Sequence, residues 1–192
     1  MSKLVVSTLE SPAASGIISV AAGDIVYSPG SVIQVIQNHT YSQSATSIPA
    51  SYTSFTNIPE LTASITPKSA SSKILIEVRW AGEFSVVGAT WDSVWNLKRG
   101  TTLIGRDVWT PTDRHIGLAI SSTSYTSADA SSTPEMAYYN YLDSPNTTST
   151  ITYNGCYTSN GALTVYTNRT VGYAAGGHEA LTSSVTLWEI AQ

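Results

Sequence analysis

Apolar and polar residues alternate with a period of two along most of the chain. Residues 74–80 show the pattern most clearly, with Ile74, Ile76, Val78 and Trp80 at every second position. Because successive side chains of a strand point to opposite faces of a sheet, this alternation predicts a strand with one buried face. Trp80 is in phase with the aliphatic positions, so we expect its ring to lie in the core. No stretch predicts a helix of three turns.

The same alternation predicts further strands, each bounded by Gly, Pro, Asn or Ser residues. They lie at residues 31–38, 61–66, 74–80, 91–97, 102–105, 116–120, 135–142, 149–157, 162–167 and 183–190. Between them, the polar stretches 39–54 and 121–134 predict two long loops, and the glycine-rich residues 173–179 predict a shorter one.

Turn residues suggest how some of these strands are connected. Lys98-Arg99-Gly100-Thr101 predicts a hairpin, and Asn160-Gly161 is a strong two-residue hairpin signal. We expect the strand at 149–157 to pair with the strand at 135–142. The Ser- and Thr-rich stretches 65–76 and 142–153 each predict a strand, a polar turn and a second strand.

The number and spacing of the strands predict an all-β protein. We expect residues 31–192 to form a two-sheet β-sandwich of jelly-roll type. Residues 1–30 read differently, as three short strands separated by turn signals such as Ser11-Pro12 and Ser15-Gly16. Strands that short do not bury a core alone, so we expect them to wrap around the same segments of neighbouring chains. A flexible N-terminal arm is the alternative.

The composition indicates that much of the surface of this protein is covered by other protein molecules. Charged residues are only 11% of the 192 residues, against about 25% in ordinary soluble domains. Ser and Thr take their place, which suits strands and turns. The net charge is −4, and among the nine Lys and Arg residues only Lys98 and Arg99 are adjacent. This distribution argues against a nucleic-acid binder.

The N-terminal residues give no indication of export or membrane insertion. Ser7, Thr8 and Glu10 interrupt the apolar residues of the first segment, so it lacks the core of a signal peptide. No run approaches the ~18 apolar residues of a membrane span. We therefore expect a soluble protein made in a cytoplasm, which acts outside a cell only after leaving by a route other than secretion.

Catalytic and metal-binding patterns are weak, and we expect no catalytic residue, cofactor or metal. No Gly-x-Ser-x-Gly elbow occurs, and His115 has no recognisable catalytic context. The carboxylate pairs Asp107 with Asp113 and Asp129 with Glu135 fall in predicted loops, where we expect them to be solvated. The single cysteine, Cys156, excludes an intrachain disulfide.

Aromatic residues in the predicted loops are better candidates for a binding role. Trp109 lies in the run 107–115, which is out of strand phase, and aromatic rings on loops stack on sugars or fill a pocket of a partner. Trp109, Arg114, His115 and Tyr125 are therefore the receptor-contact candidates. The alternative is that Trp109 packs at a subunit seam or under its own loop.

A second aromatic group lies in a predicted strand. We expect Tyr138, Tyr139 and Tyr141 to place at least one ring on each face of it.

Several stretches resemble small tail-fibre-like structural proteins from the particles of tailed bacteriophages. The matching pieces follow the same order along nearly the whole chain: 7–11 with 23–24 and 29–35, 65–74, 97–101, 142–145 with 152–153, 168–169, and 185–190. The resemblance implies a trimeric all-β assembly on a phage particle, without catalytic residues.

Taken together, these features predict a homotrimeric virion protein. Its expected role is a short tail fibre or fibre tip, docked on other virion proteins through residues 1–30. Its loops would be presented to a host cell-surface glycan or protein. A capsid decoration (cement) protein that stabilises the shell is the alternative, and a glycan hydrolase is a distant third.

Overall fold

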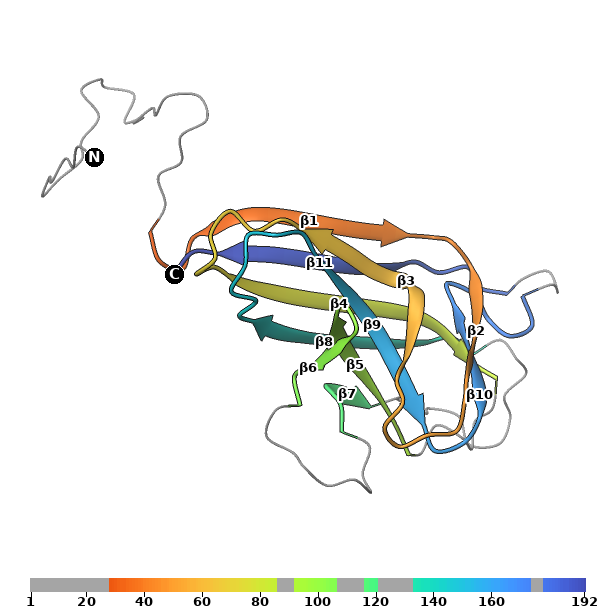
Figure 1. Ribbon diagram of the computed structural model, residues 1–192. Coiled ribbons are helices and arrows are strands. Elements are labelled where there is room, and N and C mark those ends of the chain that lie inside the picture. The colour runs from red at the N-terminus through yellow and green to blue at the C-terminus, as the bar shows by residue number, and fades with distance from the viewer. Residues whose placement is uncertain (1–27, 86–91, 107–115, 121–132, 174–177) are drawn as a thin grey trace, which may run out of the picture.

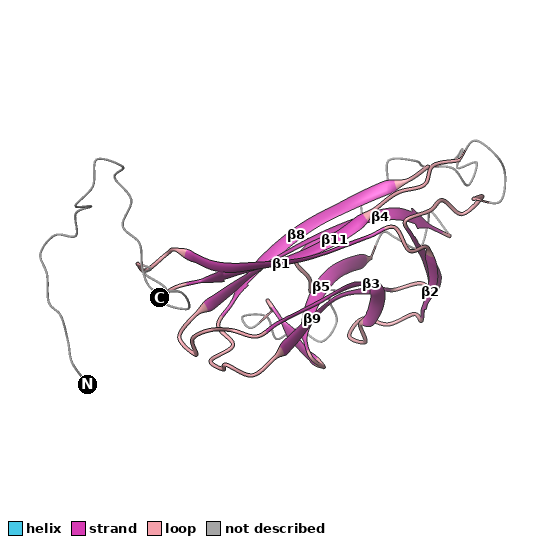
Figure 2. Ribbon diagram, turned by 90° about the horizontal axis from the view of Figure 1, so that it is seen from above, coloured by secondary structure: helices cyan, strands magenta, loops and turns pink. Residues whose placement is uncertain are grey.

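The computed structural model describes residues 28–85, 92–106, 116–120, 133–173 and 178–192. These parts of the chain contain eleven strands and no helix, so the all-β prediction is confirmed for them. The described residues therefore include no helix that could cross a membrane. The strands form two antiparallel sheets that pack face to face as a sandwich (Figures 1 and 2).

We call the six-stranded sheet sheet A and the five-stranded sheet sheet B. Sheet A consists of β1 (Val32–Thr40), β11 (Ser183–Ile190), β4 (Lys73–Phe84), β8 (Glu135–Asp143), β10 (Leu163–Thr167) and β2 (Ser44–Ile48). Within it, β1, β11, β4 and β8 lie side by side, while β10 pairs with the last residues of β4 and carries β2 on its other edge. Sheet B consists of β3 (Thr56–Ile65), β9 (Ile151–Ser159), β5 (Ser93–Arg99), β6 (Thr102–Ile104) and β7 (Ala119–Ile120).

The main core lies between the two sheets and is rich in aromatic rings. Trp80 from β4 is fully buried, as predicted, and its ring centroid lies 4.8 Å from that of Trp95 on β5. Phe84 and Tyr157 stack beside this pair at 5.3 Å. The indole N–H of Trp80 donates to Thr167 Oγ1 at 3.1 Å, so its polar atom is satisfied inside the core.

A second, smaller core lies on the other side of sheet B. Phe55 covers Val94 and Cys156 there, on the face of β5 and β9 that points away from sheet A. Lys98 Nζ donates to the Phe55 carbonyl at 2.6 Å, and Ser51 N donates to Ser159 O. Consequently β5 is buried on both faces over most of its length.

The two ends of the sandwich differ. At one end, which we call the terminal end, Gly30 N donates to Ala191 O and Ala191 N donates to Ser31 O, each at 2.9 Å. The chain therefore enters and leaves the sandwich at the same place (Figure 1). The opposite end, which we call the loop end, carries residues 41–43, 133–134 and 168–173 together with 178–182.

A buried carboxylate organises the terminal end. Glu189 is fully buried and accepts the backbone N–H groups of Lys68 and Ser69 at 2.7 and 3.2 Å, and Gln34 Nε2 at 2.5 Å. Burial alone would raise the pKa of this carboxyl, but the interactions with Gln34, the Ser72 side chain and the two backbone N–H groups outweigh it and leave the pKa below its usual value. Glu189 thereby joins β11, β1 and the turn between β3 and β4.

The predicted strand pairing is wrong in two places. The strand at 149–157 does not pair with 135–142, because β9 belongs to sheet B and β8 to sheet A. The Asn160-Gly161 turn is likewise no hairpin, since it leads from β9 in sheet B to β10 in sheet A. The polar turns at 66–72 and 144–150 also cross between the sheets. The hairpin at 98–101 is confirmed, with β5 pairing with β6 and Gly100 at a φ of 59°.

The predicted long loop at 39–54 is also wrong in part. β1 extends to Thr40, and residues 44–48 form β2, which pairs with β10 over its whole length. Ile48 is the one large apolar residue of β2, so the strand lacks a hydrophobic pattern and depends on its partner. Most of the N-terminal segment (1–27) and most of the predicted loop at 121–134 (121–132) lie outside the described residues.

Candidate functional site

The outer face of sheet A, which points away from sheet B, carries the candidate site. Its side chains are those that alternate with the core positions of each strand. The register places them in three rows across β1, β11, β4 and β8. The rows are Val35, Trp188, Leu75 and Leu142; then Gln37, Thr186, Glu77 and Asn140; then His39, Ser184, Arg79 and Tyr138.

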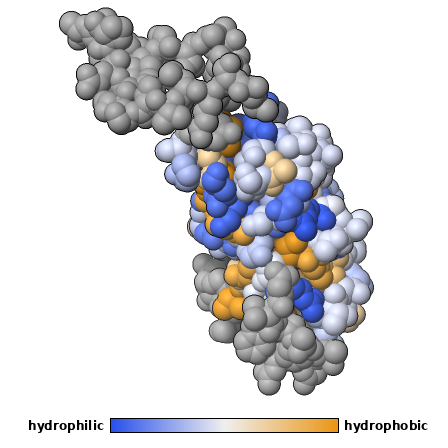
Figure 3. Space-filling model, turned by 60° about the vertical axis from the view of Figure 1, so that its left-hand side comes forward, coloured by the Kyte–Doolittle hydropathy of each residue, from blue (hydrophilic) through white to orange (hydrophobic). Residues whose placement is uncertain are grey.

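Large side chains on this face are open to solvent. Val35 and Leu142 are each 45% exposed, Tyr138 is 55% exposed and Met136, next on β8, is 60% exposed. Figure 3 shows another side of the molecule, where hydrophobic side chains also lie between hydrophilic ones on the described surface. Scattered apolar residues are normal on a protein, but a connected group on one sheet face indicates contact with another molecule.

Glu77 holds two aromatic rings in place at the centre of this face. Its Oε1 accepts the Tyr138 hydroxyl at 2.5 Å, and its Oε2 accepts the Trp188 indole N–H at 2.6 Å. The hydrogen bond to Glu77 is the main cause that raises the pKa of Tyr138 above its usual value, so the hydroxyl stays protonated. Because the polar atoms of both rings point to one carboxylate, the two rings flank it in a defined orientation.

A cleft of about 410 Å³ opens on the same face toward the loop end. The cleft is lined by Arg79 and Ala81 of β4, by residues 134–136 at the start of β8, and by residues 180–182 just before β11. Arg79 Nη2 donates to Thr182 Oγ1 at 3.1 Å, which holds the guanidinium in the cleft. Arg79 also lies directly beside Tyr138 in the register, so the cleft and the ring pair are continuous.

Two buried side chains fix the segments that border the cleft. Asn168 donates from Nδ2 to Thr40 O and Ser42 O at 3.1 and 2.8 Å, and its Oδ1 accepts the Ser183 hydroxyl at 2.7 Å. Glu83, which is 2% exposed, accepts hydrogen bonds from Thr133 N and Oγ1 and from Val171 N. The entry to β8 and the segment after β10 are thus tied to β4.

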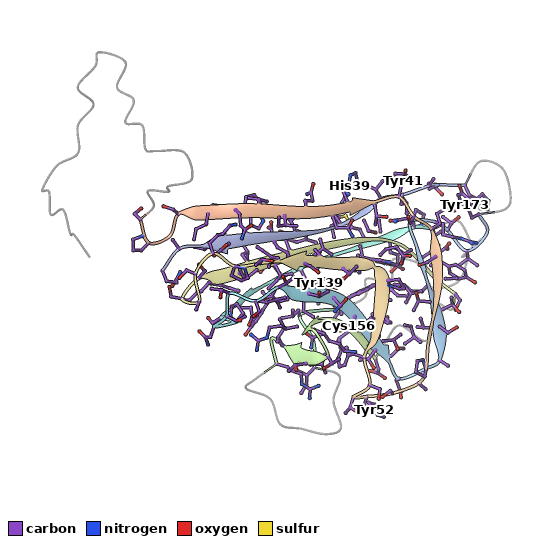
Figure 4. The ribbon with its side chains drawn as sticks, turned by 45° about the horizontal axis from the view of Figure 1, so that its top comes forward. His39, Tyr41, Tyr52, Tyr139, Cys156 and Tyr173 are labelled. Carbon is purple, nitrogen blue, oxygen red and sulfur yellow. The ribbon has the colours of Figure 1, made fainter. Side chains whose placement is uncertain are left out.

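Further aromatic side chains lie at the loop end. The Arg169 guanidinium lies 4.9 Å from the Tyr166 ring centroid and 5.5 Å from that of Tyr173. Tyr41, between the two residues whose carbonyls bind Asn168, is 81% exposed. Figure 4 shows Tyr41 and Tyr173 toward this end, while Tyr52 lies on a different side of the molecule.

The structure does not test the four receptor-contact candidates from the sequence. All four lie outside the described residues: Trp109, Arg114, His115 and Tyr125. The tyrosines of β8 are described: Tyr138 is exposed on the outer face, and Tyr139 is buried in the core.

Sequence reasoning missed three members of the outer face: Trp188, Glu77 and Arg79. Alternation could have identified Trp188, because it is out of phase with the core residues Val185 and Leu187.

Two titratable groups of the sandwich, Asp143 and Cys156, are buried. Asp143 forms an ion pair with Arg99 at 3.0 Å and accepts the Tyr153 hydroxyl at 2.7 Å. Burial raises the pKa of the Cys156 thiol to about 12, against a smaller opposing effect of Lys98. Among the described residues there is no group of three or more His, Cys, Asp or Glu side chains that could hold a metal ion. What the described surface offers is recognition through ring faces, amides and a guanidinium.

No protein-family model matches the chain, and a search of curated proteins found no match.

Proposed function

We propose that this chain is a structural protein of a tailed-bacteriophage particle, a homotrimeric short tail fibre or fibre tip. In this role it docks on other virion proteins through residues 1–30 and presents its opposite end and the outer face of sheet A to the host. The resemblance of residues along most of the chain to such proteins is the starting point of the proposal.

The fold that we propose for the sandwich is a jelly roll. The order β1-β11-β4-β8 in sheet A and β3-β9-β5-β6 in sheet B supports it. In both sheets, strands distant in sequence lie side by side, as two interlocked Greek keys require. Viral capsid and lectin domains use this architecture, which agrees with a particle protein that contacts a surface.

The polarity of the sandwich is the observation that carries the proposal. Residues 30 and 31 bond to residue 191 at the terminal end, so the N-terminal segment leaves the sandwich there. The cleft and the exposed Tyr41 lie toward the loop end. A protein with one attached end and one presented end suits a fibre.

Truncation tests this arrangement. A chain that begins at Ser28 should still fold, because all eleven described strands begin after residue 31, but it should no longer enter particles. Light scattering of the full chain should give about three times 20.4 kDa. A monomer at micromolar concentration, or normal incorporation of the truncated chain, would refute the trimer or the docking segment respectively.

Capsid decoration remains the second candidate. The row with Val35 and Leu142, each 45% exposed, gives the outer face of sheet A an apolar strip for contact with a shell. Labelled particles separate the two roles. A fibre should appear at the tail in a few tens of copies at most, and a decoration protein should appear over the shell in hundreds.

A further inference from the structure

We propose that the outer face of sheet A binds an uncharged oligosaccharide, which lies across Trp188 and Tyr138 and extends into the cleft beside Arg79. This inference rests on the proposed function, because it names the class of host molecule that the presented surface would recognise.

The orientation of the two rings is the first argument. Glu77 accepts hydrogen bonds from the indole N–H of Trp188 at 2.6 Å and from the hydroxyl of Tyr138 at 2.5 Å. The ring faces, which carry the negative part of the aromatic quadrupole, then remain as the contact surface. The C–H groups on one side of a sugar ring are apolar and slightly positive, so they suit such a face. Rings that are already held in place lose little conformational entropy on binding.

The arrangement of the rings is the second argument. Trp188 pairs with Leu75 and Tyr138 pairs with Arg79, so the two rings belong to strands on opposite sides of β4. Their side chains converge on the carboxylate of Glu77, so the two rings form one subsite. The cleft lined by Arg79 lies beside this subsite and gives room for further units of the same chain.

The polar groups beside the rings are the third argument. Gln37, Asn140 and Arg79 carry planar groups with paired hydrogen-bonding atoms, which match neighbouring hydroxyls of a sugar. The Gln37 amide is oriented by its bond to Thr186 Oγ1 at 3.0 Å. Arg79 is held by Thr182 and lies at the junction of the ring pair and the cleft.

The balance of charge decides between sugar classes. Among the described residues, the outer face and the lining of the cleft carry the cations Lys73 and Arg79 and the carboxylates Glu77 and Glu135. Glu83 at the border of the cleft is buried and hydrogen-bonded to the backbone. The formal charges of the first four groups cancel, so the surface complements an uncharged ligand rather than an acidic one. The cleft also agrees with this class, since Ala81 and Met136 give it apolar walls beside its few polar groups.

Calorimetric titration of the full chain tests the proposal. The probes are six-unit oligomers of glucose, mannose and galactose, together with an oligogalacturonate of the same length as the acidic ligand. We expect at least one neutral oligomer to bind saturably. Tyr138→Ala should weaken that binding by about tenfold or more, equivalent to 1.4 kcal/mol. Tyr138→Phe keeps the ring but loses the bond to Glu77, so it should lose less.

Tyr52→Ala is the matched control, because Tyr52 is 46% exposed and lies elsewhere on the surface. It should leave binding unchanged, and circular dichroism should show that all three variants are folded. Three results would overturn the proposal: no neutral oligomer binds at millimolar concentration, the acidic oligomer binds more tightly, or Tyr138→Ala binds as the unaltered chain does.

Two further readouts identify rival explanations. If Tyr138→Ala abolishes self-association of the chain and no sugar binds, the face is a contact between copies and the proposal is overturned. If the purified chain binds sugar but labelled chain is missing from particles, the proposed function is refuted and this inference is not. Particle incorporation without any sugar binding would refute this inference alone.

Discussion

Removing the negative charge of Glu189 should weaken the terminal end of the sandwich by a measurable amount. The carboxylate is fully buried and accepts three hydrogen bonds, from Lys68 N, Ser69 N and Gln34 Nε2. Glu189→Gln keeps the size of the side chain but offers only one acceptor oxygen and adds a donor. A hydrogen bond to a charged group contributes about 1.5–3 kcal/mol, so we expect a loss of about 2 kcal/mol of unfolding free energy.

Thermal unfolding followed by circular dichroism measures this loss. For a chain of this length, about 2 kcal/mol corresponds to a fall in Tm of about 4–8 °C. Glu60→Gln is the matched control, because Glu60 is only half-buried and accepts a single hydroxyl, Ser44 Oγ, at 2.7 Å. Its loss should be about 1 kcal/mol or less.

The dependence on pH gives a second, independent check. The folded pKa of Glu189 lies below the usual 4.5, so the unfolded chain takes up this proton at a higher pH than the folded chain. The stabilisation is therefore fully present above about pH 5.5 and is lost as the pH falls through 4.5 toward the folded pKa. The difference between the original chain and Glu189→Gln should shrink over that range. A difference that stays constant with pH, or an equal loss in Glu60→Gln, would refute the reasoning.

Two substitutions and one labelling experiment test the core. Trp80→Ala should cost about 3–5 kcal/mol in denaturant unfolding, because the cavity lies between two packed sheets; a loss under about 1 kcal/mol would contradict its central position. Gly82→Ala should cost about 3 kcal/mol, since a Cβ there would lie 1.9 Å from the Tyr166 carbonyl oxygen, and a folded variant of unchanged Tm would contradict that contact. Cys156 should react with a thiol reagent at pH 8 only as the chain unfolds, because the thiol is fully buried with a pKa of about 12; fast labelling of the native protein would show that its cover opens.

Part of the outer face follows from the alternation of residues along the chain. The alternation in 74–80 separates Trp80 from Glu77 and Arg79, and the same rule places Trp188 opposite Leu187. The assembly of these residues does not follow from the pattern, because Glu77 is separated from Tyr138 and Trp188 by 61 and 111 residues. A pattern of period two tells on which face a side chain lies, but it does not tell which strand lies beside it.

The sequence by itself determined that the chain is built from strands, which positions face the core, and where the 98–101 hairpin turns. Those features follow from the local pleat of the backbone and from the φ of Gly100, so neighbouring residues suffice to specify them. Only the tertiary structure decided that the turns at 66–72, 144–150 and 160–162 cross between the sheets, and that the weakly patterned residues 44–48 form a strand. Strand partners are chosen by backbone hydrogen bonds and core packing between residues far apart in sequence. Glu189 is the plainest case, since its partners Lys68 and Ser69 precede it by about 120 residues.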